Sequence, residues 1–142
     1  MTQTIAKNAD ASLRRIAELS DLAEDLLRRA RARGADQAEL SLSESRGLNV
    51  AVRMGDVETV EYTRDRGLSL IVYFNQRKAS ASTADLSPSG LEATLDQACA
   101  IARYTEADPF AGLGDAARMA SEFPDLDLWH PWALDADAAV EL

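Results

Sequence analysis

The stretch over residues 38–84 constrains the fold most, because apolar and polar residues alternate along it through several short runs. A period of two places successive side chains on opposite faces of a β-strand, so the pattern predicts a sheet with one apolar face. Short connections between the runs favour antiparallel neighbours over parallel crossovers. We therefore predict a five-stranded antiparallel meander, with turns at Gly47, Gly55-Asp56, Arg66-Gly67 and Asn75-Gln76.

Three features of the predicted strands refine this sheet. The spacing from Val57 to Val60 is odd, and a bulge between them would restore the alternation. The run over residues 68–74 is apolar on one face and carries further apolar bulk on the other, which predicts a central strand that is partly covered on both sides. Residues 78–83 alternate small alanines and serines, and we interpret them as a thin edge strand.

Two amphipathic helices are predicted on either side of the sheet segment. The first is expected to begin at Ser12 and to end before Gly34, and the second begins at Ser87-Pro88 and ends near Tyr104-Thr105. Each apolar stripe can pack on the sheet, so the predicted fold class is α+β, a two-layer sandwich. The stripes are Ile16, Leu19, Ala23, Leu26 and Ala30 in the first helix, and Leu91, Leu95, Ala98 and Ala102 in the second.

Length and charge divide the chain into three predicted parts. A chain of 142 residues with 46% apolar content is sufficient for one domain with a core, which we place at residues 12–105. Residues 1–11 show no pattern and are expected to be a disordered lead-in. Residues 106–142 are expected to form an acidic linker, since residues 105–142 contain nine acids and one base. Asp135 caps a final helical pattern without a stop signal, so we expect a further domain to follow.

Composition also restricts the compartment and the partners. No run approaches the roughly 20 apolar residues that cross a bilayer, and the first residues do not resemble a signal peptide, so we predict a cytoplasmic protein without membrane contact. The net charge of −9 disfavours direct binding of nucleic acid. The single cysteine, Cys99, excludes an internal disulfide framework and lies in a helical pattern typical of a buried residue.

Few side chains could carry chemistry. His130 is the one histidine, and together with the distant Cys99 it cannot form an ordinary zinc site of His and Cys ligands. Asp125 and Asp127 form only a weak carboxylate pair on an extended segment, and we interpret His130 as a packing or interface residue. The residues alone indicate a binding or scaffolding domain, and we assign no catalytic, cofactor-binding or metal-binding residue.

Several short strings follow one another in a fixed order along the chain. They are GADQAE at 34–39, VRMGDVETVE at 52–61, GL to VY at 67–73, RKASAST at 77–83, IARYT at 101–105, DP at 108–109, AGL at 111–113, PDLDL at 124–128 and HP at 130–131. Together they resemble the N-terminal domain of the TldD/PmbA family, and the later strings resemble its PmbA branch, also called TldE. Ala79 departs from the pattern, because the family would have glycine there.

The resemblance implies a bacterial subunit that pairs with a TldD-like subunit in a heterodimeric metallopeptidase. Its substrates would be extended peptides, including microcin precursors and the antitoxin CcdA. The zinc-binding HExxxH motif would lie on the TldD partner, and no residue of this chain matches it, so we expect no cofactor in this chain. The resemblance leaves open an alternative role as a regulatory module that binds DNA gyrase without proteolysis.

Overall fold

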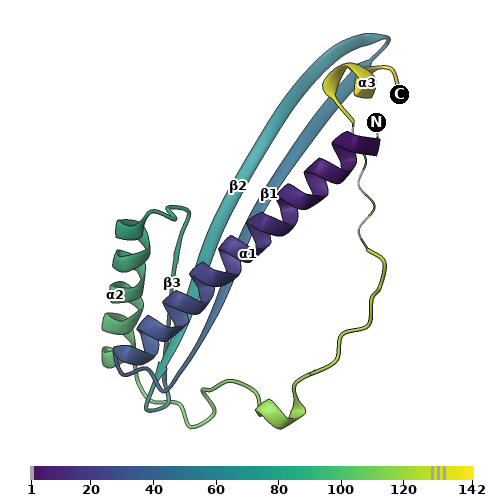
Figure 1. Ribbon diagram of the computed structural model, residues 1–142. Helices are drawn as coiled ribbons and strands as arrows, with labels where there is room; N and C mark the ends of the chain where they lie inside the picture. Colours follow the sequence, from purple (N-terminus) through teal and green to yellow (C-terminus); the bar gives the residue numbers. More distant parts are fainter. Residues whose placement is uncertain (1, 129, 131, 133) are drawn as a thin grey trace.

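The chain forms an α+β fold in which two helices pack on one face of a three-stranded antiparallel sheet (Figure 1). The computed structural model describes residues 2–128, 130, 132 and 134–142. The strand order is β1-β2-β3, which confirms the antiparallel neighbours, but the five-stranded meander is wrong because three strands form the sheet. The elements are α1 (Thr2–Ala32), β1 (Gln37–Arg53), β2 (Asp56–Phe74), β3 (Arg77–Thr83), α2 (Pro88–Tyr104), the 3-10 helix η1 (Ala116–Arg118) and α3 (Ala136–Val140).

Two of the four predicted turns connect strands. Met54 and Gly55 join β1 to β2 with φ values of 55° and 87°, and Asn75 and Gln76 join β2 to β3 with φ values of 50° and 65°. Two central residues with positive φ are the requirement of the type I′ turn, whose twist matches that of the flanking strands. The weaker turn signal at residues 75–76 therefore marks a real reversal.

The other two predicted turns lie inside continuous strands. Gly47 pairs with Thr63 in the middle of the β1–β2 ladder, and Gly67 pairs with Ser43. An ideal Cβ on Gly47 would lie 2.7 Å from Oγ1 of Thr63, so glycine serves close cross-strand approach at this position. The sequence prediction interpreted each of these two glycines as a turn, and it therefore divided each long strand into two short ones.

One irregularity in the ladder agrees with the sequence. Ala51 pairs with Thr59 whereas Val52 pairs with Val57, so Glu58 is an extra residue on β2. This is the bulge that the odd spacing of two valines predicts, and it keeps the apolar side chains of both strands on one face.

The core lies between this face of the sheet and the two helices. All four predicted stripe residues of α2 are buried, but only the last two of α1 are fully buried, while Ile16 is exposed. Arg33 at the end of α1 pairs with Asp96 of α2 at 3.2 Å, which joins the two helices. The buried cluster comprises Leu26, Ala30, Ala35, Ala38, Leu68, Leu70, Val72, Phe74, Ala79, Ala81, Leu91, Leu95, Ala98, Cys99 and Ala102.

Helix α1 begins at Thr2, so the start predicted at Ser12 is wrong and residues 2–11 are helical in the structure. Its other end matches the prediction. Gly34 has φ +93°, and the N–H of Ala35 donates to the carbonyl of Ala30 at 3.2 Å. These are features of the Schellman motif, in which a left-handed residue satisfies the last helical carbonyls. The division of the chain into three parts remains a prediction.

The caps predicted for the later helices are confirmed. Ser87 Oγ accepts a hydrogen bond from the N–H of Gly90 at 3.2 Å at the start of α2, and this helix ends at Tyr104 as predicted. Asp135 Oδ1 accepts from the N–H of Ala138 at 2.9 Å at the start of α3. In the described chain, no helix is both long enough and apolar enough to span a bilayer.

Candidate functional site

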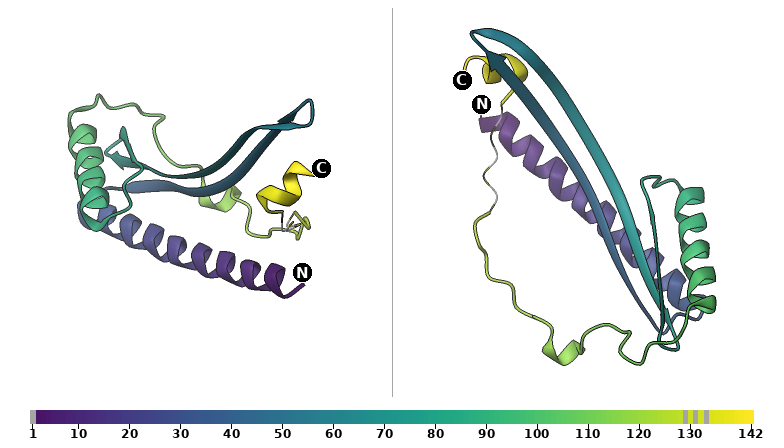
Figure 2. Two further views of the ribbon diagram at one scale, coloured as in Figure 1. Left: turned by 90° about the horizontal axis from the view of Figure 1, so that it is seen from above. Right: turned by 180° about the vertical axis from the view of Figure 1, so that it is seen from behind.

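A two-stranded ribbon, formed by residues 44–53 of β1 and 56–66 of β2, extends beyond the core and is the most prominent surface feature (Figure 2). The first half of α1 extends in the same direction, and α3 lies near the tip of the ribbon. Strand β3 pairs only with residues 68–74 of β2. Within the described residues, both edges of the ribbon are therefore unpaired, and such edges present N–H and C=O groups that can bind another strand.

One face of the ribbon is apolar, with four exposed side chains toward the tip, whereas Leu48 and Val50 on it are half-buried. Its side chains continue the core face of the sheet, because each pair follows the same register as the buried pairs below it. The C-terminal segment covers part of this face, and a shallow cavity of about 460 Å³ lies between Leu48 and Leu142. Contiguous exposed apolar residues typically mark an interaction surface. The residues of this apolar face are Leu48, Val50, Val52, Val57, Val60 and Tyr62.

At the base of the ribbon, three arginines surround one carboxylate. Glu44 Oε2 accepts from Nε of Arg15 on α1 at 2.9 Å, and Oε1 accepts from Arg46 and Arg64 at 3.1 Å each. The Glu44 side chain is only 7% exposed. Hydrogen bonds from Arg46 and Arg15 lower the pKa of Glu44 to about 2, so the carboxylate stays charged at neutral pH. We call these four residues the Glu44 cluster.

Sequence analysis missed the Glu44 cluster, although one signal was available. Glu44 occupies an apolar-face position of β1, in the alternation that includes Leu42 and Leu48. A charged residue in such a position requires partners, because an unpaired charge that is nearly buried is costly.

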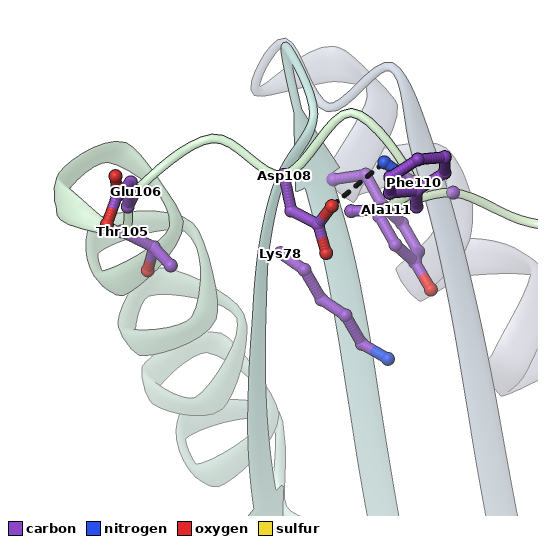
Figure 3. Close-up of a pocket in the computed structure, with 8 residues that line it drawn as sticks. Lys78, Thr105, Glu106, Asp108, Phe110 and Ala111 are labelled. Atoms are coloured by element: carbon purple, nitrogen blue, oxygen red, sulfur yellow. Dashed lines mark hydrogen bonds between the residues drawn. The ribbon is translucent and has the colours of Figure 1, made fainter.

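A second concavity lies where the segment after α2 crosses the sheet (Figure 3). It has a volume of about 340 Å³ and is lined by Lys78, Glu106 and Asp108, while the amine of Lys78 lies 5.8 Å from the centroid of the Tyr73 ring. Asp108 Oδ1 accepts from the N–H of Phe110 at 2.9 Å, and the N–H of Asp108 donates to the carbonyl of Gln76. These bonds anchor the loop to the β2–β3 turn, so we interpret this pocket as a consequence of loop packing.

The candidate residues from the sequence do not assemble into a reactive site. The N–H of Asp127 donates to Oδ1 of Asp125 at 2.9 Å, so this pair forms a local turn. Cys99 is buried as predicted, and this burial raises the pKa of its thiol. His130 is exposed, and the neighbours expected to pack with it, Trp129 and Pro131, lie outside the described residues. The described residues contain no group of three or more His, Cys, Asp or Glu side chains placed to hold a metal.

Residues 38–102 match the model of PmbA/TldA metallopeptidase domain 1. Metalloprotease PmbA of Escherichia coli O157:H7 is 45% identical over 108 residues, which cover 76% of this chain and 24% of that protein. A Metalloprotease PmbA homolog of Haemophilus influenzae is 43% identical over 105 residues, covering 74% and 23%. The chain spans about a quarter of the length of these curated relatives.

Two solved structures are similar to the chain. A candidate modulator of DNA gyrase from Bacteroides thetaiotaomicron superposes with a TM-score of 0.68 at 28% identity, covering 76% of this chain and 24% of that one. TldE from Thermococcus kodakarensis superposes with a TM-score of 0.59 at 16% identity, covering 78% and 25%, which supports the fold alone. The resemblance noted in the sequence is thus confirmed, and the chain belongs to the PmbA/TldD metallopeptidase family.

Proposed function

We propose that this chain is a non-catalytic part of a PmbA/TldE-type metallopeptidase of the cytoplasm, and that its ribbon binds extended peptides and a TldD-like subunit. Family membership supports the metallopeptidase assignment. The observation that carries the binding role is the ribbon, which among the described residues combines two unpaired edges with a partly exposed apolar face. Zinc would be bound by the TldD-like subunit.

Strand addition explains how such a ribbon could accept many peptides. An added strand is held mainly by main-chain hydrogen bonds, which do not depend on sequence, while pockets for alternate side chains provide selectivity. The apolar face would contact every second residue of the peptide or a complementary surface of the partner. No feature of the described residues favours the alternative role as a gyrase-binding module over this one.

The proposal is tested with the full-length protein and its TldD-like partner. The two are expected to give zinc-dependent cleavage of an extended peptide that neither gives alone. Val60→Asn on the apolar face should weaken peptide binding or subunit pairing, measured by fluorescence anisotropy and by gel filtration. Ile101→Asn on α2 is the matched control, because both parent side chains are 44% exposed.

Two results would contradict the proposed role. One is that Val60→Asn leaves peptide binding and subunit pairing unchanged, and that a complex from which the ribbon has been deleted cleaves the peptide as fast as the intact complex. The other is stoichiometric zinc and peptide turnover in the purified 142-residue chain without any partner.

A further inference from the structure

The Glu44 cluster contains more positive charge than its single carboxylate neutralises. Arg46 and Arg64 lie directly opposite each other on β1 and β2, and both donate to the same oxygen of Glu44. Like charges in directly opposed cross-strand positions destabilise a sheet. Arg15 is balanced further by Glu18 at 2.8 Å, so the excess charge resides on the cross-strand pair.

This arginine pair also retains donors that face solvent. Each guanidinium carries five N–H donors, and within the described residues each gives one hydrogen bond, to Glu44. The side chains of Arg46 and Arg64 are 66% and 61% exposed. Glu44 holds the two groups side by side without consuming their remaining donors. A pair of guanidinium groups fixed in this way is suited to a second carboxylate.

We propose that Arg46 and Arg64 form a carboxylate-binding site that selects acidic side chains in peptides bound along the ribbon. This inference rests on the proposed peptide-binding role. The next pair on the same face is Leu48 and Tyr62, so a bound peptide would place an acidic residue over the arginines and apolar residues toward the tip. A polynucleotide fits less well, because it requires a broad basic surface and the chain carries a net charge of −9.

The test compares two labelled extended peptides that differ only in one central Glu or Gln, using anisotropy with the purified chain. The Glu peptide should bind about fivefold more tightly, the order of magnitude of one partly exposed ion pair. This preference should disappear in the double variant Arg46→Gln/Arg64→Gln and should shrink at high salt. Arg28→Gln, an exposed arginine on α1, is the control and should retain the preference.

The other possible outcomes distinguish the carboxylate site from the peptide-binding role on which it rests. Equal binding of both peptides would overturn the carboxylate site while leaving the peptide-binding role intact. Binding of neither peptide would overturn both. Tighter binding of a labelled single-stranded DNA, lost in the double variant, would show a phosphate site instead. Because a folding defect would mimic lost selectivity, Arg64→Lys provides a second variant, which keeps the charge and should weaken the preference only partly.

Discussion

Gly90 lies in the first turn of α2, and we predict that its replacement by alanine destabilises the chain, although helix propensity alone would favour alanine. Replacing a helical glycine with alanine normally stabilises a protein by about 1 kcal/mol. At this position an ideal Cβ would lie 2.6 Å from the carbonyl oxygen of Asp85 and equally close to its Oδ2. Since the carbonyl belongs to the backbone, the segment before the helix must move to accommodate the methyl group.

The movement of Asp85 would disturb the helix cap. Asp85 Oδ1 accepts from the N–H of Ser87 at 2.9 Å, and Ser87 in turn caps α2 through the N–H of Gly90. Losing an N-cap costs about 0.5–2 kcal/mol, and overpacking costs about 1–3 kcal/mol. Set against the propensity gain, Gly90→Ala should lower the free energy of unfolding by about 1–3 kcal/mol. The corresponding fall in Tm is about 3–10 °C for a chain of this size.

Urea unfolding followed by circular dichroism measures this change, with coincident fluorescence transitions as the check of two-state behaviour. Gly114→Ala is the control, because its Cβ would meet only Met119 Sδ at 3.8 Å, an ordinary contact. The control should change stability by no more than about 0.5 kcal/mol. An increase in stability for Gly90→Ala would refute the steric reasoning.

Two further predictions concern the core and the Glu44 cluster. Leu95→Ala should destabilise the chain by about 2–5 kcal/mol in urea unfolding, because Leu95 is fully buried, whereas the exposed Leu126→Ala should have little effect. The pKa of Glu44 is lowered from 4.5 to about 2, so its stabilising contribution is complete above pH 4.5 and is lost as the pH falls from 4.5 toward 2. Glu44→Gln should therefore lose less stability than wild type across that interval, and parallel losses would contradict the assigned role.

The elements that could be predicted from the sequence are those specified by neighbouring residues. Ser87 and Pro88 start α2 through local hydrogen bonding and a fixed φ, and both ends of this helix were predicted correctly. Gly34 ends α1 for a similarly local reason. The start of α1 was wrong because Ser12 resembles a cap although the helix already begins at Thr2, and a cap-forming residue is also tolerated within a helix.

The strands were harder to delimit because the same residue type serves two purposes. Glycine supplies positive φ at Gly55, where β1 reverses, but at Gly47 it allows Thr63 to approach across the ladder. Charged residues, Glu44 and Arg46, occupy the apolar-face positions just before Gly47, so the apolar alternation is interrupted there as it is at Gly55, and the local pattern does not separate a turn from a continuous strand. The distinction depends on which residues lie opposite, a property of the whole hairpin.

This ambiguity also explains why the Glu44 cluster was missed. Its partners lie 20 and 29 residues away in the sequence, at Arg64 and Arg15. Once β1 and β2 are recognised as single strands joined at residues 54–55, with one bulge at Glu58, the register follows and places Arg46 opposite Arg64. Dividing the hairpin into four short strands removed that pairing. In this chain the position of two turns therefore determines whether the arginine pair, and with it the proposed carboxylate site, can be found from sequence.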